Sequence, residues 1–325
     1  METIMKFLAA PLITAVLFCN VLFASEKLIT FTGTNPAGHV QGLASDGKVI
    51  FRAFDYGIIK SDMNGKFLKK ADCKMLPGKS WMHAGSPCLA DGKLYVPVNF
   101  GSFNRNLNGK PSLNYIQIFD LELNFISSFH VPEVEHGAGC ITYANGRFFV
   151  SGGRAYQMSG NAVFEYDKNF KFIRKYDIDI TSYVGVQTIA FDGKYFWLGC
   201  FGNRSMSYRL SRDFKDITYY DFKSSFGLSP LPSGKMLICS TMDKDEAKII
   251  SPEKYILKKK YVDIDANGIA TLEGQEYIDL SALVRVTSKH PDTVWVYRCS
   301  SKLSMECFAA VKMYLPARHV LKITK

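Results

Sequence analysis

Apolar and polar positions along the chain repeat as pairs of short strands joined by a tight turn. In most copies an apolar run ends in Asp, Asn or Ser, followed by Gly and a basic residue, and a second apolar run begins directly afterwards. Residues 88–96 and 141–150 are examples, with Asp91-Gly92 and Asn145-Gly146 at their centres. Such dipeptides between apolar runs predict β-hairpins, because the tightest turn needs positive φ angles at its centre.

The turn recurs along most of the chain. Its glycines are 40 to 54 residues apart, at Gly47, Gly92, Gly146, Gly193, Gly234 and, in a weaker copy, Gly274. Between successive copies lies a second turn, in which a strand ends in Asp and another strand follows, as in Asp120 before residues 124–126. A repeat of about 40–50 residues that holds four short strands is typical of a β-propeller blade.

The repeat therefore predicts an all-β fold, a β-propeller of six four-stranded blades. Five blades are the alternative, because residues 275–318 fit the pattern poorly. An additional strand at residues 27–31 precedes the first blade and another at residues 319–323 ends the chain. We expect these two strands to pair in one blade and close the ring, because closure removes exposed strand edges.

The Asp-Gly-Lys turns and the strands that end in Tyr-Asp or Phe-Asp give a resemblance to extracytoplasmic β-propellers, including the YVTN, NHL and gluconolactonase-like families. The resemblance covers most of residues 28–265 and implies the fold. A narrower element, Gln41-Gly42-Leu43 before the first turn, resembles glutamine cyclotransferases, and it implies that activity as one alternative function.

The first residues are typical of a targeting signal. Lys6 precedes an apolar run at residues 7–18, and Ala24 offers a small residue for cleavage. An apolar run of about twelve residues is shorter than the ~20 that span a bilayer but suits a signal peptide. We expect residues 1–24 to be a signal peptide, residues 25–325 to form a single domain, and the protein to be secreted or periplasmic, with no membrane span after cleavage.

The charge balance favours acidic partners. The chain has 40 Lys and Arg against 30 Asp and Glu, a net charge of +10. We expect a small-molecule or glycan ligand of acidic character, no nucleic acid, and a monomer. No Gly-x-Ser-x-Gly, P-loop, Rossmann or His-Glu-x-x-His pattern is present, which argues against the familiar hydrolase, NTPase and dehydrogenase designs.

The cysteines show no metal-ligand spacing. Four of them lie in apolar runs and are expected to behave as small hydrophobic residues; these are Cys88, Cys140, Cys200 and Cys239. Cys299 and Cys307 flank a short polar turn, and whether they form a disulfide is open.

Polar residues that enter the innermost strand of each blade are the candidate site. Three of the six histidines occupy this position in consecutive blades, namely His39, His83 and His136. Imidazole suits zinc, copper, iron, nickel or manganese, so these three are the predicted metal ligands, and a divalent metal is the candidate cofactor. Further predicted ligand-binding residues are Gln41, Glu135, Gln187, Arg154 and Arg204, since arginines on successive blade loops can clamp a carboxylate.

The same histidines also have a structural interpretation. They lie eight, nine and ten residues before their turn glycines, so they need not point the same way, and a strand-capping role fits equally. The residues thus favour a binding or interaction protein that recognises a polar or acidic ligand at the channel mouth. The alternative is a metal-dependent lyase or hydrolase of sugar acids, lactones or anionic polysaccharides.

Overall fold

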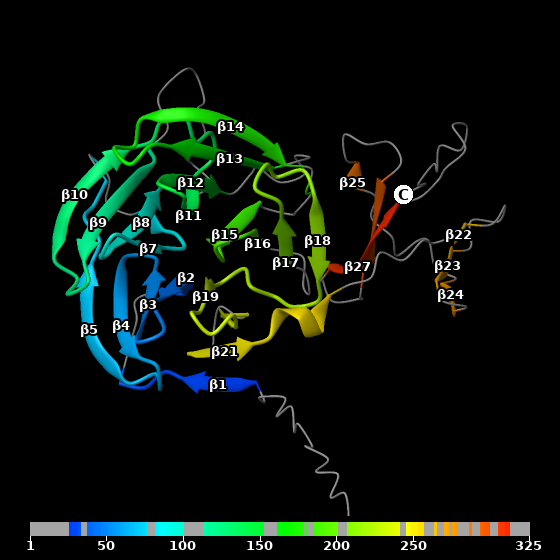
Figure 1. Ribbon diagram of the computed structural model, residues 1–325, viewed down its shortest axis with the longest axis horizontal. Coiled ribbons are helices and arrows are strands. Elements are labelled where there is room, and N and C mark those ends of the chain that lie inside the picture. The colour runs from blue at the N-terminus through cyan, green and yellow to red at the C-terminus, as the bar shows by residue number, and fades with distance from the viewer. Residues whose placement is uncertain are drawn as a thin grey trace, which may run out of the picture.

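The computed structural model describes two kinds of segment (Figure 1). Backbone and side chains are described for residues 26–33, 38–76, 78, 82–100, 113–152, 161–178, 180, 185–200, 207–240 and 245–256, and the backbone alone for six short strands between residues 263 and 312. The predicted signal peptide at residues 1–24 and the predicted last strand at residues 319–323 lie outside the described residues.

Five antiparallel sheets are arranged in a ring (Figure 1). From the innermost to the outermost strand, blade 1 contains β2 (Val40–Ser45), β3 (Val49–Phe54), β4 (Gly57–Asp62) and β5 (Phe67–Asp72), and blade 2 contains the divided strand β6 (His83–Ala84) and β7 (Cys88–Ala90), then β8 (Lys93–Asn99), β9 (Tyr115–Asp120) and β10 (Phe125–His130). In the same order, blade 3 contains β11 (Ala138–Ala144), β12 (Arg147–Gly152), β13 (Asn161–Tyr166) and β14 (Phe172–Ile178), and blade 4 contains β15 (Val186–Phe191), β16 (Phe196–Cys200), β17 (Ser207–Leu210) and β18 (Ile217–Tyr220). Blade 5 contains β19 (Leu228–Pro230), β20 (Met236–Ile238), β21 (Glu246–Ile250) and, as its outermost strand, β1 (Lys27–Thr30).

The N-terminal strand closes the ring, as predicted, but with a different partner. β1 pairs antiparallel with β21, so that Lys27 lies opposite Ile249, and it forms the outermost strand of blade 5. Directly after β1, the Thr32 amide donates to the Gly65 carbonyl in blade 1 at 3.0 Å. The strand therefore joins the last blade to the first. The predicted pairing of this strand with residues 319–323 stays a prediction, because those residues lie outside the described part of the chain.

In the described part of the chain the hydrophobic core consists of five clusters, each lying between two neighbouring blades. Blades 5 and 1 share one of them, in which Leu43 and Phe54 pack with Phe226 and Leu237. The other four clusters join blades 1 and 2, 2 and 3, 3 and 4, and 4 and 5. Because a ring of five blades has five interfaces, the chain is a five-bladed β-propeller. The fold class is confirmed, and the alternative blade count is the correct one.

The strands after blade 5 form two further sheets. A 3₁₀ turn at Pro252–Tyr255 follows β21; then come β22 (Asp263–Ile264), β23 (Ala270–Leu272) and β24 (Gln275–Tyr277), and β25 (Val286–Thr287), β26 (Thr293–Cys299) and β27 (Met305–Lys312). The predicted sixth turn, at Gly274, does join paired strands, since Leu272 lies opposite Gln275. Among the described strands that hairpin pairs with no blade of the ring, so the expected sixth blade is wrong. The assignment of residues 25–325 to one domain stays a prediction.

The two predicted turns have the expected backbone conformations. At the hairpin turns Asp91 and Gly92 have φ angles of 47° and 70°, and Asn145 and Gly146 have 51° and 79°. At the second turn Phe170 has a φ of 60°, an uncommon value for a bulky residue, and its side chain is buried between blades 2 and 3. Phe170 stacks on Phe148 with ring centroids 4.6 Å apart.

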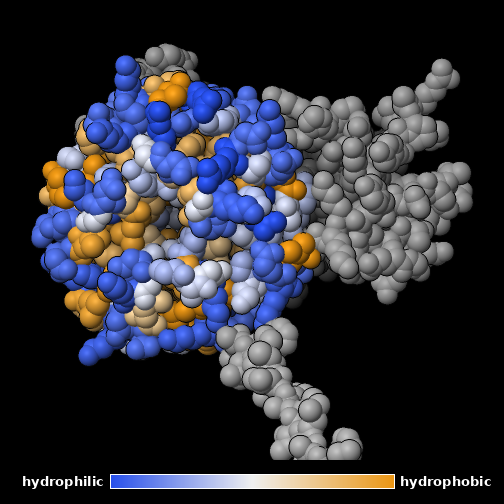
Figure 2. All heavy atoms as spheres, in the orientation of Figure 1, coloured by the Kyte–Doolittle hydropathy of each residue, from blue (hydrophilic) through white to orange (hydrophobic). Residues whose placement is uncertain are grey.

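Burial falls from the inside of each blade to the outside. Every residue of β2 is buried, whereas β5 and β10 are mostly exposed. The four cysteines predicted to be core residues are buried and free of disulfides, as is Cys73. The side chains of Cys299 and Cys307 lie outside the described residues. Figure 2 shows polar side chains over much of one face of the ring, with apolar ones among them. Among the described residues there is no helix of the length and apolarity that a bilayer crossing needs.

Candidate ligand site at the channel mouth

The innermost strands give the ring two different ends. We call the end where these strands begin the strand-start face and the end with the Gly-containing turns the hairpin face. A pocket near the hairpin face is lined by all five blades, including Ser45, Thr142, Phe191 and Ser229. The predicted site residues His39 and His83 are not in its lining, because they lie at the strand-start face.

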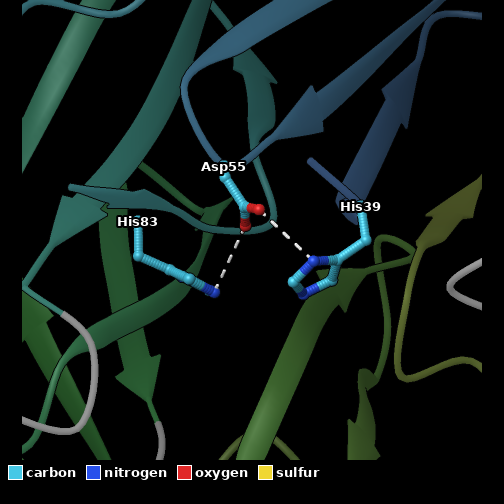
Figure 3. A group of neighbouring side chains, drawn as sticks. All are labelled: His39, Asp55 and His83. Carbon is cyan, nitrogen blue, oxygen red and sulfur yellow. Dashed lines mark ion pairs between the residues drawn. The ribbon is translucent and has the colours of Figure 1, made fainter. Parts of the chain in front are cut away.

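His39, Asp55 and His83 form a cluster at the strand-start face, which we call the triad (Figure 3). One ligand atom from each residue lies within 4.8 Å of the other two. His39 Nδ1 is 3.3 Å from Asp55 Oδ2, and His83 Nε2 is 3.7 Å from Asp55 Oδ1. The carboxylate therefore lies between two imidazoles that come from two different blades.

Backbone pairing brings the three residues together. Val40 lies opposite Phe54 in the β2–β3 hairpin, so His39 and Asp55, the next residues outward, are neighbours. The Ala84 amide donates to the Asp55 carbonyl at 3.0 Å, which ties blade 2 to blade 1 and places His83 beside the same carboxylate. Sequence reasoning missed Asp55, although it follows directly on the apolar strand β3.

Gly38 leaves the space that the carboxylate occupies. Its φ is +88°, and a Cβ at this position would lie 2.2 Å from Asp55 Oδ2. A side chain here would overlap the carboxylate while also straining the backbone. The glycine before His39 is therefore required by the geometry of the triad.

Gln41 completes the hydrogen bonding of the cluster. The pairing of β2 and β3 shifts between Val40 and Gly42, a β-bulge that re-aims the buried Gln41 side chain. Gln41 Nε2 donates to Asp55 Oδ1 at 2.7 Å and lies 2.6 Å from His39 Nε2. Since Nε2 of His39 accepts from the amide, Nδ1 carries the hydrogen that faces Asp55.

Burial and charge oppose each other within the triad. Burial alone would raise the pKa of Asp55, but hydrogen bonds from His39 and Gln41 and the charge of His83 outweigh it and lower that pKa. Burial lowers the pKa of His83, against the attraction of Asp55. Their side chains are 16% and 29% exposed, and that of His39 is 42% exposed, so the triad is in reach of solvent. At neutral pH the cluster combines a carboxylate with an imidazole, His83, whose charged form burial disfavours.

The other predicted site residues are placed differently. His136 is half-buried before β11 and is not part of the triad, which is the only such group among the described residues. Glu135 forms an exposed ion pair with Lys175 at 2.7 Å. Gln187 lies at the equivalent β-bulge of blade 4, between Val186 and Thr188. The predicted ligand-binding residues Arg154 and Arg204 lie outside the described residues.

The Gln41-Gly42-Leu43 element has a structural explanation in this fold. A Cβ on Gly42 would lie 2.2 Å from the Cα of Ser86, so the glycine permits blades 1 and 2 to approach closely. Leu43 is fully buried between blades 5 and 1. The tripeptide thus reflects blade packing, with Gln41 alone reaching the site.

Comparisons with known proteins add little beyond the fold. No known protein family matches the sequence, and no curated protein matches it. Among solved structures, the chain is similar to a protein of unknown function from Bacteroides caccae, with 16% identity over 68% of this chain and 82% of that one and a TM-score of 0.42. It is also similar to the WD40 β-propeller domain of Doa1, with 12% identity over 77% and 94% of the two chains and a TM-score of 0.43. Neither likeness bears on function, and the resemblance to the YVTN, NHL and glutamine cyclotransferase families has no support from them.

Proposed function

We propose that this protein is an exported binding protein that holds a polar, acidic ligand over His39, Asp55 and His83 at the strand-start face. The observation that carries the proposal is the convergence of these three side chains from two blades, in a position that solvent reaches. His39 is 42% exposed, so a ligand can reach the cluster from solvent.

The surroundings of the triad also favour a binding role. The glycine at position 38 is fixed by the triad itself, because a Cβ there would lie 2.2 Å from Asp55 Oδ2. The bulge at Gln41 interrupts regular pairing of the innermost strand next to the site, where bulges commonly re-aim a functional side chain.

An acidic ligand is favoured by charge and by hydrogen bonding. The chain has an excess of ten basic residues over acidic ones, which raises the local concentration of anions around it. At the site, both ring nitrogens of His39 are taken by Gln41 and Asp55, but the second ring nitrogen of His83 can donate to a carboxylate or sulfate, and protonation strengthens such a bond. Sugar acids and acidic oligosaccharides present these groups together with hydroxyls.

The test is a binding screen with matched variants. Isothermal titration would compare uronic acids, their oligomers and sulfated oligosaccharides with the corresponding neutral sugars, using wild type, His83→Gln and His130→Gln. His130 is the control because it lies on the outermost strand β10 and stacks on Tyr115 with ring centroids 4.7 Å apart. We expect at least one acid to bind wild type and the control, and to bind His83→Gln at least about tenfold more weakly, as the loss of one charged hydrogen bond of ~1.5–3 kcal/mol implies.

Two outcomes would contradict the proposal. Equal loss of binding in both variants would place the ligand elsewhere, and binding of neutral sugars alone would refute the acidic class. Turnover of a bound acid in the same experiment would favour the lyase or hydrolase alternative. Export is tested separately: the mass of the protein recovered from its host should correspond to a chain that begins at Ser25.

A further inference from the structure

The triad has the donor set of a metal site. Two imidazoles and one carboxylate are ligands that first-row divalent ions such as zinc, manganese, iron and cobalt prefer, whereas calcium and magnesium favour oxygen alone. With metal–ligand bonds of about 2.0–2.2 Å, neighbouring donor atoms in a tetrahedral or octahedral site are about 3.0–3.5 Å apart. His39 Nδ1 meets this at 3.3 Å from Asp55 Oδ2, whereas His83 Nε2 faces the other oxygen, Oδ1, at 3.7 Å. With one donor atom per residue the three atoms lie within 4.8 Å of one another, so the side chains must close by on the order of 1 Å around an ion.

We propose that His39, Asp55 and His83 bind one divalent first-row transition-metal ion. The inference deepens the proposed function, because it rests on the same site and names the ion through which an acidic ligand is held. Three protein ligands leave coordination positions for oxygen atoms from outside, and a carboxylate of the ligand can fill them.

Gln41 is the positioning residue of this site. In the structure it contacts Nε2 of His39 at 2.6 Å, while Nδ1 faces Asp55. When the ion takes the place of the hydrogen on Nδ1, that hydrogen moves to Nε2, so the imidazole stays neutral. Rotation of the Gln41 amide then presents its oxygen to the Nε2 hydrogen, the arrangement that usually orients a ligating histidine. The rotation gives up the hydrogen bond that Gln41 Nε2 donates to Asp55 Oδ1, and the charge of the ion replaces it.

The proposed ligand set differs from the set predicted from the sequence, and this difference makes the proposal testable. Sequence reasoning grouped His136 with His39 and His83, whereas the structure replaces His136 by Asp55. Variants at residues 55 and 136 therefore separate the two hypotheses. Asp55→Asn keeps the shape of the side chain and retains hydrogen bonding to Gln41, so it removes the charge with little change in packing.

In the experiment, the protein from residue 25 to residue 325 is first freed of metal with EDTA. It is then titrated separately with Co²⁺ and with Zn²⁺. Calorimetry gives stoichiometry and affinity, and the visible spectrum of Co²⁺ reports nitrogen and oxygen coordination. We expect one ion per chain in wild type, at least about 100-fold weaker binding in Asp55→Asn and in His83→Gln, and unchanged binding in His136→Gln and His130→Gln. Gln41→Ala should keep the stoichiometry and the Co²⁺ spectrum while losing about 10–100-fold in affinity.

Each remaining result counts against the proposal. Wild type that binds neither ion, or Asp55→Asn that binds as tightly as wild type, would overturn it, as would loss of binding in His136→Gln with retention in Asp55→Asn. Circular dichroism and the thermal midpoint show whether each variant is folded, and His39→Gln replaces any variant that is not. Acid binding that is lost in His83→Gln without any metal would refute the metal site alone, and metal binding without acid binding would refute the acidic ligand alone.

Discussion

Replacing Gly38 by Ala tests whether the backbone before His39 is shaped for the triad. The φ of Gly38 is +88°, and an added Cβ would lie 2.2 Å from Oδ2, 2.8 Å from Cγ and 2.9 Å from Cβ of Asp55. The methyl group therefore overlaps the whole end of the Asp55 side chain. Because the Asp55 backbone is held by its hydrogen bond to Ala84, the side chain must turn away.

Gly38→Ala should affect the ligand distances of the triad much more than the stability of the fold. A left-handed φ costs a non-glycine residue about 1–2 kcal/mol, a modest part of the ~5–15 kcal/mol that stabilises a folded domain. To reach ordinary contact with the new methyl group, the carboxylate must retreat by about 1 Å, whereas a metal site tolerates about 0.2 Å in its ligand distances. We therefore expect Gly38→Ala to fold, with a small fall in thermal midpoint, and to bind Co²⁺ about 10–100-fold more weakly.

Gly193→Ala is the matched control. Gly193 has a φ of +96°, and a Cβ there would meet nothing within 4 Å. Both variants carry similar backbone strain, but only Gly38→Ala crowds Asp55. Thermal unfolding should show comparable losses, while calorimetry with Co²⁺ should show weaker binding in Gly38→Ala alone. Full Co²⁺ affinity in Gly38→Ala, or equal weakening in both variants, would refute this account of the site.

Three further predictions concern the ring. Phe170→Ala should lower the unfolding free energy by about 3–5 kcal/mol. Phe170→Gly should be about 1 kcal/mol more stable than Phe170→Ala, the reverse of the usual order, because the φ of residue 170 is 60°. A urea denaturation in which the Ala variant is more stable than the Gly variant would contradict backbone strain at this position. Backbone hydrogen bonds lower the pKa of Asp120 and Asp167 below the ordinary 3.8, so their contribution to stability is complete above about pH 4 and is lost as the pH falls through the lowered pKa values. The difference in thermal midpoint between wild type and the Asp120→Asn/Asp167→Asn variant should shrink over that range, and a constant difference would refute the assignment. Arg52 has two buried nitrogens with no partner among the described residues, while its ion-pair partner Asp245 remains 39% exposed. Thermal unfolding of Arg52→Met should therefore show unchanged or higher stability, and a fall in unfolding free energy above about 2 kcal/mol would contradict this.

The fold was largely predictable because its turns are local. Asp91-Gly92 and Asn145-Gly146 lie between apolar runs, and their backbone angles follow from the two residues themselves. Alternation of apolar and polar positions then assigns the strands around each turn. A period near 45 residues is enough to identify blades, since each blade repeats the same local sequence of strands and turns.

The number of blades was harder to predict because it depends on a contact between distant residues. β1 could pair with any unpaired strand edge, and only its register with β21 shows that the ring closes after five blades. The Gly274 turn resembles the others locally, and it does form a hairpin, but no local signal indicates whether a hairpin joins the ring. Closure is decided by packing between Leu43 and Phe226, which are nearly two hundred residues apart.

The site illustrates the same division between local and distant information. The sequence shows histidines at the beginning of three innermost strands, but in an antiparallel hairpin the end of the second strand lies at the same face as the beginning of the first. The residue after β3 was therefore as strong a candidate as the residue before β2, and a search of both positions would have found Asp55. It would not have excluded His136, because His83 joins the triad through the hydrogen bond between Ala84 and Asp55, a contact between blades that no repeat pattern contains. In a repeat protein, then, both ends of each hairpin supply the candidates for a site, and the contacts between repeats decide which of them meet.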